Sequence, residues 1–182
     1  NYHGWQYQPN ASSVQETLGK AVSVLLRNET ELMGAGRTDS GVHARQMFAH
    51  FDTEADFNKN TLVSKLNSYL PKDIVVFNLH QVADEAHARF DAKKRTYEYH
   101  IHTFKDAFEN EQSWYLHQKL DLEKMNQGAK MLFEYQDFQC FSKVPTDVMT
   151  FTCSLFEAHW NQDGNRIVFT IAADRFLRNM VR

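Results

Sequence analysis

The residues best suited to chemistry lie in one glycine-rich segment, residues 34–44, which reads Gly-Ala-Gly-Arg-Thr-Asp-Ser-Gly-Val-His-Ala. Glycine lets a backbone approach a ligand closely, and functional side chains are concentrated on loops. Asp39 is a candidate nucleophile or base, and Arg37 beside it would lower the pKa of its carboxyl group and keep it ionised at neutral pH. The glycine spacing fits neither the dinucleotide fingerprint nor the Walker A motif. From the pattern alone, an Asp that caps a turn beside a surface Arg is slightly favoured over a catalytic Asp.

A second candidate is the strand predicted for residues 95–103, where Tyr97 and Tyr99 share one face and His100 and His102 share the other. Two adjacent tyrosines could stack on a nucleic-acid base, although aromatic residues at alternate strand positions more often pack in a core. The two histidines have a spacing that can hold zinc on a strand, but no third ligand is evident. We therefore expect solvated histidines and no metal site.

The charge is informative only in its distribution. The 182 residues carry 20 Lys and Arg against 23 Asp and Glu, a net charge of −3, which argues against indiscriminate binding to a polyanion. Residues 86–105 nevertheless hold an excess of three positive charges, and residues 174–182 an excess of two, including Arg175, Arg178 and Arg182. This distribution is typical of a protein that binds one shaped polyanion in one cleft, and equally typical of ordinary solvated strand edges and helix ends.

Both helices and strands are predicted to position these residues. Helices are predicted for residues 14–27, after the capping pair Ser13 and Glu16, for 59–69, ended by Pro71, and for 122–133, after Asp121. Strands are predicted for residues 46–52, 74–80, 95–103, 151–160 and 166–173, the last two joined by a turn at Asp163-Gly164. Residues 176–182 repeat apolar side chains at i and i+4, as the first turns of a helix do.

The predicted class is therefore α+β with a largely antiparallel or mixed sheet. A boundary near residues 82–92 would separate an N-terminal subdomain, 1–85, from a C-terminal subdomain, 86–182, each with helix and strands in a similar order. We expect two related α/β subdomains whose sheets join or abut, and both ends of the chain read as cut.

The composition indicates what class of protein this is and in which compartment we expect it. A 42% hydrophobic and 24% charged chain is typical of a folded globular protein, and no apolar run approaches the roughly 20 residues that a membrane span needs. The two cysteines, Cys140 and Cys153, form no disulfide framework, which indicates a reducing compartment and makes the cytoplasm the default expectation.

In combination, these motifs resemble the bacterial tRNA pseudouridine synthase A family along the whole chain. The most specific match is Gly36-Arg37-Thr38-Asp39-Ser40-Gly41-Val42-His43-Ala44. It is joined by Tyr2-His3-Gly4-Trp5-Gln6, His50-Phe51-Asp52-Thr53, His87-Ala88-Arg89-Phe90, Arg95-Thr96-Tyr97-Glu98-Tyr99 and Phe176-Leu177-Arg178-Asn179-Met180-Val181-Arg182. The departures are few: Ser40 stands where Ala is usual, and Ala86 where an aromatic residue often precedes the His-Ala-Arg-Phe motif.

The resemblance implies isomerisation of uridine to pseudouridine at positions 38, 39 and 40 in the anticodon stem-loop of tRNA, without a metal or an organic cofactor. Asp39 matches the family's essential aspartate, Tyr97 the active-site tyrosine that stacks on the flipped base, and Arg37 the arginine that assists flipping. The further substrate-binding candidates are Arg182, as a partner of the Asp39 carboxylate, and Arg178, His43 and Arg89.

Fold and assembly follow from the same resemblance. It implies two ferredoxin-like or RNA-recognition-type halves, joined through a mostly antiparallel central sheet with a basic cleft between them, and a homodimer that binds one tRNA across both subunits. Family members also extend beyond both ends of this chain.

Two rival interpretations stay open. In the first, the chain is a non-catalytic RNA-binding module of the same fold class, whose tyrosines stack on bases while Asp39 only shapes a loop. In the second, it is a small-molecule hydrolase built on Asp39 and the histidines. A steep dependence of ligand affinity on salt would favour nucleic acid over a neutral substrate.

Overall fold

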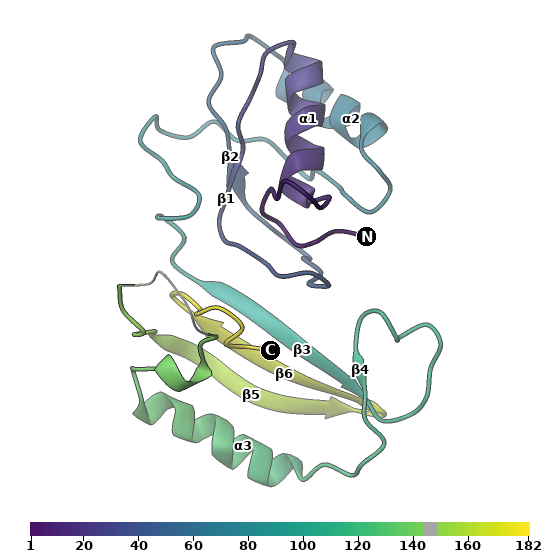
Figure 1. The fold of residues 1–182 in the computed structure, drawn as a ribbon, viewed down its shortest axis with the longest axis vertical. Coiled ribbons are helices and arrows are strands. Elements are labelled where there is room, and N and C mark those ends of the chain that lie inside the picture. The colour runs from purple at the N-terminus through teal and green to yellow at the C-terminus, as the bar shows by residue number, and fades with distance from the viewer. Residues whose placement is uncertain (144–148) are drawn as a thin grey trace. The chain divides into compact units, whose positions relative to one another are not determined.

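The structure, a computed structural model, describes residues 1–143 and 149–182. They form two compact units, Asn1–Ala92 and Lys93–Arg182, which we call unit 1 and unit 2. The described residues hold three α-helices and two β-sheets, so the fold is mixed α+β (Figure 1). The boundary expected between residues 85 and 86 stays a prediction, and the division into the two units follows Ala92.

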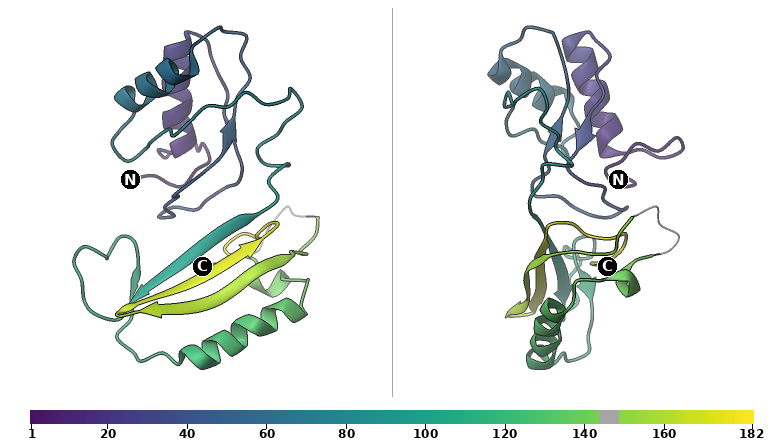
Figure 2. Two further views of the ribbon diagram at one scale, coloured as in Figure 1. Left: turned by 180° about the vertical axis from the view of Figure 1, so that it is seen from behind. Right: turned by 90° about the vertical axis from the view of Figure 1, so that its left-hand side faces the viewer.

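Unit 1 is built on two helices, α1 (Val14–Leu26) and α2 (Lys59–Tyr69), which pack together (Figures 1 and 2). Ser13 caps α1 by accepting a hydrogen bond from the Glu16 backbone N–H, and Asn58 caps α2 in the same way. The apolar faces of the two helices meet in a core whose buried members are Ala21, Val22, Leu32, Leu62, Leu66 and Leu70. The two helix predictions are confirmed, except that Arg27 is the left-handed C-cap of α1 rather than its last residue.

The strands of unit 1 are shorter than predicted. Only β1 (Met33–Gly34) and β2 (Ala49–His50) pair, in antiparallel register, so the strand expected for residues 46–52 shrinks to two residues. The strand expected for residues 74–80 is wrong. The Asn67 side chain donates to the Val76 carbonyl and accepts from the Val76 N–H, at 2.8 and 2.7 Å. These bonds replace a strand ladder at Val76, while the side chains of Ile74, Val76 and Leu79 still pack on the core.

Unit 2 is a four-stranded sheet in the order β4-β3-β6-β5. The strands are β3 (Arg95–His102), β4 (Trp114–Tyr115), β5 (Leu155–Asp163) and β6 (Arg166–Ala173). Neighbouring strands pair antiparallel except β3 and β4, which are parallel, so the sheet is mixed as expected. Gly164 has a φ of +57° in the two-residue turn that joins β5 to β6, a conformation that glycine adopts without strain.

The third helix, α3 (Leu122–Met131), covers one face of this sheet (Figure 2). Asp121 caps it as predicted, and two short 3₁₀ turns follow, Leu132–Glu134 and Gln139–Phe141. Ala129 packs on Ala158 and Ile171 of the sheet. The Asn126 side chain fixes the register of helix and sheet by bonding to both the N–H and the carbonyl of Trp160, at 2.8 and 3.0 Å.

Three further expectations for unit 2 are corrected. The strand predicted for residues 151–160 begins at Leu155 and runs to Asp163. Residues 176–182 form no helix: Asn179 has a φ of +62°, outside the right-handed helical region, and the Met180 N–H bonds to the Leu177 carbonyl in a turn. The expectation of solvated histidines fails at His102, which is buried, because its imidazole bonds to Ser113 at 2.6 Å and stacks on Tyr115.

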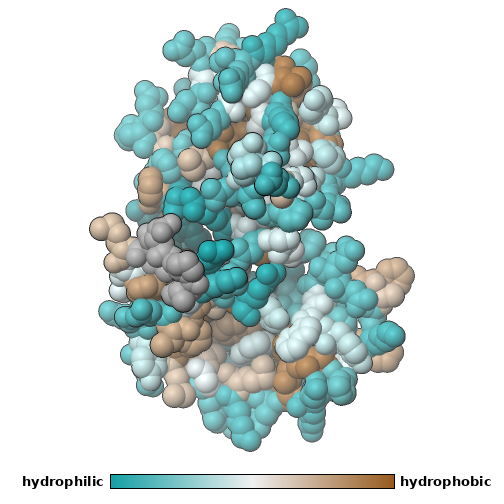
Figure 3. Space-filling view, viewed as in Figure 1, coloured by the Kyte–Doolittle hydropathy of each residue, from teal (hydrophilic) through white to brown (hydrophobic). Residues whose placement is uncertain are grey.

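The surface is largely hydrophilic on the face shown in Figure 3, with apolar side chains in separate patches. Among the described residues, no helix is long and apolar enough to span a membrane.

Candidate active site

The candidate aspartate lies on the loop between β1 and β2, and a tight turn presents it to solvent. The Val42 N–H bonds to the Asp39 carbonyl at 3.2 Å, and Gly41 has a φ of +79° while Ser40 does not enter the positive region. This is a type II turn, whose third position requires glycine or a residue that tolerates positive φ. Asp39 opens the turn, and both Asp39 and Arg37 are exposed. Across the described residues, no ion pair joins Arg37 to Asp39.

The N-terminal segment holds this loop from one side, and we call the contact of Gly4 and Trp5 with Thr38 the brace. The Trp5 backbone N–H is shared between the Thr38 hydroxyl at 3.1 Å and the Thr38 carbonyl at 3.3 Å. Gly4 has a φ of +87°, and a Cβ there would lie 2.0 Å from the Thr38 carbonyl oxygen. Only glycine permits so close an approach of the two backbones.

The brace continues under the loop through the Trp5 side chain. The indole is 7% exposed and packs on Gly34, where a Cβ would lie 2.3 Å from the indole nitrogen. Gln15 of α1 ties the same segment to the residue before β1, because its side chain accepts from the Tyr7 N–H at 2.9 Å and donates to the Leu32 carbonyl at 2.6 Å. Helix, strand and N-terminal segment therefore fix the residue directly before Asp39.

The start of the chain is itself held by Asp73. The carboxylate accepts hydrogen bonds from the Asn1 amide and the Tyr2 hydroxyl, both at 3.0 Å. The bond from Asn1, with a smaller contribution from Tyr2, lowers the pKa of Asp73. Burial, followed by the hydrogen bond to Asp73, raises the pKa of the Tyr2 hydroxyl. Both shifts keep the hydroxyl protonated and the carboxylate charged at neutral pH, which preserves this attachment.

The other candidates of unit 1 are also exposed. His43 follows the type II turn. Arg89 lies in another turn, and its guanidinium carbon is 5.8 Å from the centroid of the Phe90 ring. Asp39, Arg37, His43 and Arg89 are thus all at the surface of unit 1. A hollow beside α1, lined among others by Tyr7, Glu16 and Lys20, contains none of them.

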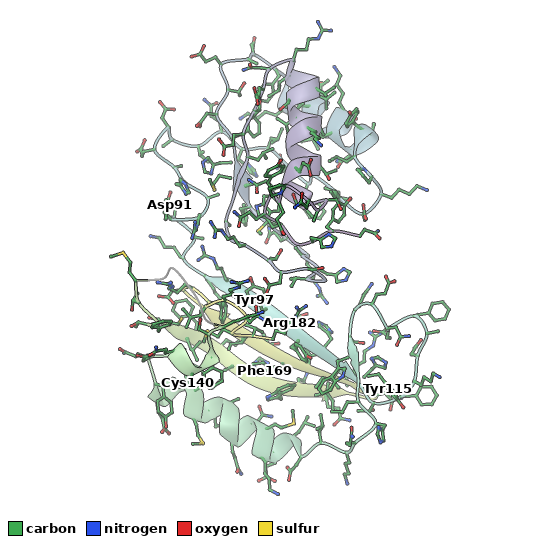
Figure 4. The ribbon with its side chains drawn as sticks, viewed as in Figure 1. Asp91, Tyr97, Tyr115, Cys140, Phe169 and Arg182 are labelled. Atoms are coloured by element: carbon green, nitrogen blue, oxygen red, sulfur yellow. The ribbon has the colours of Figure 1, made fainter. Side chains whose placement is uncertain are left out.

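Unit 2 holds the remaining candidates, Tyr97, Arg178 and Arg182. Tyr97 and Arg182 are labelled in Figure 4. Tyr97 is partly buried on β3, packs against the core of Ala129, Ala158 and Ile171, and meets Phe176 edge-on at 5.2 Å. Arg178 and Arg182 are exposed in the turn after β6, where the Arg178 carbonyl accepts from the Lys143 N–H and the Arg182 N–H donates to the Asn179 carbonyl. The roles of these residues toward a substrate stay predictions.

Sequence reasoning missed the brace. Its only signal was the pair Gly4-Trp5 in a loop segment, and nothing in that pair points to Thr38 more than 30 residues later. The described residues contain no group of three or more His, Cys, Asp or Glu that could hold a metal ion.

Comparison with known proteins places the chain in a family. A family model described as tRNA pseudouridine synthase matches residues 129–182, within unit 2. Over its whole length the chain is 53% identical to tRNA pseudouridine synthase A of Bacteroides thetaiotaomicron and 51% identical to that of Parabacteroides distasonis, spanning 69% and 73% of those proteins. It is 35% identical to tRNA pseudouridine synthase A 2 of Clostridium perfringens, spanning 75% of it. The chain belongs to the tRNA pseudouridine synthase A family.

Proposed function

We propose that this protein is an isomerase that converts uridine to pseudouridine in tRNA, at positions 38, 39 and 40 of the anticodon stem-loop. The family relationship supports the reaction and the tRNA substrate. The observation that carries the assignment of the site is the placement of Asp39, which is exposed on a type II turn while the residue before it, Thr38, accepts the shared hydrogen bond from the Trp5 N–H through its hydroxyl and its carbonyl.

The reaction explains why a fixed carboxylate is needed. The bond from C1′ to N1 of uracil breaks, a bond from C1′ to C5 forms, the C5 proton leaves and N1 takes up a proton, so the product is an isomer of the substrate. Asp39 either adds to the ring or the sugar, or removes a proton from C2′, and each of these steps needs an ionised carboxylate at a defined position. An exposed turn on a braced loop supplies that position.

The remaining residues have supporting roles in this proposal. Tyr97 stacks on the flipped base, and Arg37 fills the space that the base leaves, which offsets part of the few kcal/mol that unstacking costs. Arg182 pairs with the Asp39 carboxylate, and Arg178, His43 and Arg89 contact the RNA. We further propose that the two units are ferredoxin-like halves and that the protein acts as a homodimer.

The test is tritium release from a tRNA transcript that carries C5-tritiated uridine, since formation of pseudouridine expels that hydrogen. We expect release by the wild-type protein and none by Asp39→Asn, which keeps the shape of the side chain and removes its charge. Asp56→Asn is the matched control, because Asp56 is another exposed carboxylate of unit 1, and it should release tritium normally.

Two results would count against the proposal. Wild-type turnover in Asp39→Asn would remove Asp39 from the chemistry. A folded protein that binds tRNA but releases no tritium would favour the non-catalytic RNA-binding module.

A further inference from the structure

A turn in unit 1, residues 87–91, is organised by a histidine side chain (Asp91 is labelled in Figure 4). The His87 ring nitrogen Nδ1 accepts hydrogen bonds from the backbone N–H groups of Arg89 and Phe90, at 3.2 and 3.3 Å. In return the His87 backbone N–H donates to the Asp91 carboxylate at 2.7 Å, and the Asp91 N–H donates to the His87 carbonyl at 2.9 Å. The imidazole therefore acts as the cap of this turn, as Asn or Asp does at a helix start.

A second histidine attaches the turn to the sheet of unit 1. His50, on β2, accepts a hydrogen bond from the Ala88 N–H through its own Nδ1, at 3.1 Å. The rings of His50 and His87 have centroids 4.7 Å apart, and those of His87 and Phe90 are 4.2 Å apart. The three rings contact one another in sequence at interplanar angles of 60° and 31°, and the last of them, Phe90, is 75% exposed.

These bonds fix where the imidazole protons are. A neutral imidazole has one donor and one acceptor nitrogen, and in both rings the acceptor is Nδ1, so Nε2 carries the proton. Each ring therefore offers an Nε2–H donor, and a metal ion, which needs a lone pair on the ligating nitrogen, is disfavoured at Nε2. The ligand that suits this arrangement is a hydrogen-bond acceptor.

Two neighbours specify the acceptor further. Arg89 is exposed in the same turn, and its guanidinium favours an anionic oxygen, above all that of a phosphate. Phe90 offers a flat apolar ring, on which bases of single-stranded nucleic acid stack. The Asp91 carboxylate also lies in this turn, where it accepts a hydrogen bond from the His87 backbone N–H.

We propose that His50, His87, Arg89 and Phe90 form an RNA contact, in which the Nε2–H groups and the guanidinium bind a backbone phosphate and Phe90 stacks on an adjacent base. This inference rests on the proposed function for its tRNA ligand. It assigns roles to His50, His87 and Phe90 that the site argument did not include.

The experiment measures binding of a tRNA transcript by the full chain, with Asp39→Asn as the parent so that no turnover occurs. In His87→Asn, the amide oxygen replaces Nδ1 as the cap while the Nε2–H donor is lost. We expect about three- to tenfold weaker binding, the usual effect of one hydrogen bond, with thermal unfolding unchanged. His50→Asn should act in the same way. In His80→Asn, at an exposed histidine of the same unit, affinity should not change.

Three more variants separate a role in binding from a role in structure. His87→Gln keeps an N–H group near Nε2 but loses the cap, so its main effect should be a lower unfolding temperature. Phe90→Leu removes the stacking ring from an exposed position and should weaken binding without changing unfolding. Arg89→Gln should reduce the slope of log affinity against log salt by about 0.7 to 0.9, the contribution of one phosphate contact. The His→Asn variants should leave that slope unchanged, because a neutral donor releases no counterion.

The inference is overturned if His50→Asn combined with His87→Asn binds the transcript as the parent does, or if Phe90→Leu and Arg89→Gln both have normal affinity. Failure of the proposed function is seen separately, as absence of tritium release by the wild-type protein. A wild-type protein that releases tritium while these variants bind normally would overturn only the inference.

Discussion

Replacing Gly4 by Ala tests the brace most directly. The new Cβ would lie 2.0 Å from the Thr38 carbonyl oxygen, which is backbone and cannot rotate away, and a φ of +87° is strained for any residue with a Cβ. The positive φ costs about 1–2 kcal/mol, and loss of the shared Trp5 hydrogen bond costs about 1 kcal/mol more. The substitution should therefore release the loop that carries Asp39 at a cost of at least about 2–3 kcal/mol.

If this cost falls on the position of Asp39, kcat/KM should drop by at least about 30- to 150-fold, at 1.36 kcal/mol for each factor of ten. Tritium release under single-turnover conditions measures the drop, and circular dichroism with thermal unfolding reports whether unit 1 remains folded. Gly128→Ala is the matched control, because Gly128 lies in α3 with no atom within 4 Å of the added Cβ. It should keep full activity and stabilise the helix by about 0.5–1 kcal/mol. A Gly4→Ala protein with kcat/KM within threefold of wild type would refute the reasoning.

Two further predictions concern titratable groups outside the loop. Burial raises the pKa of the Cys153 thiol, so at pH 8 a thiol reagent should label the exposed Cys140 in the native protein and Cys153 only after unfolding; equal labelling rates would contradict this. The backbone hydrogen bond from Lys124, followed by that residue's side chain, lowers the pKa of Asp121, so the unfolded chain binds this proton more readily than the folded one. The stabilisation is then complete above the ordinary carboxyl pKa and lost below about pH 4. The free energies of unfolding of wild type and Asp121→Asn, measured in urea, should therefore converge as the pH falls. A difference that stays constant with pH would exclude the effect.

Local signals in the sequence predicted the helices well. The bounds of α2 are those expected, because Asn58 supplies the cap and Pro71 the stop within the segment itself. The long strands β3 and β6 could also be predicted from the sequence, because both are rich in β-branched and aromatic residues, which favour strands.

The wrong predictions share one cause: a local sequence pattern does not show the backbone conformation or the distant residues that decide the structure of a segment. The apolar run at the start of segment 74–80 is typical of a strand, but Asn67 supplies the backbone hydrogen bonds at Val76 that a neighbouring strand would have supplied. The i, i+4 repeat near the C-terminus gives no sign of the positive φ at Asn179. His102 was expected in solvent because its contacts, Ser113 and Tyr115, come from a later segment.

The same limit applies to the candidate site. The glycine-rich segment alone identified Asp39 and Arg37 as residues of interest, since their types and spacing are local. What holds Asp39 in place comes from residues 4 and 5, far away in the sequence, and the Nε2–H form of His50 and His87 depends on backbone donors that only the folded turn brings to them.

The shared hydrogen bond of Trp5 has a consequence for how the loop can be observed. Its amide proton is protected from exchange with water only while Thr38 is docked, so the exchange rate at this single amide measures the opening free energy of a loop to which Trp5 does not belong. By linkage, a ligand that binds only the docked loop must slow exchange at Trp5 by the factor by which it shifts the docking equilibrium. Hydrogen exchange at Trp5 in the N-terminal segment therefore reports the stability of the loop that carries the candidate site.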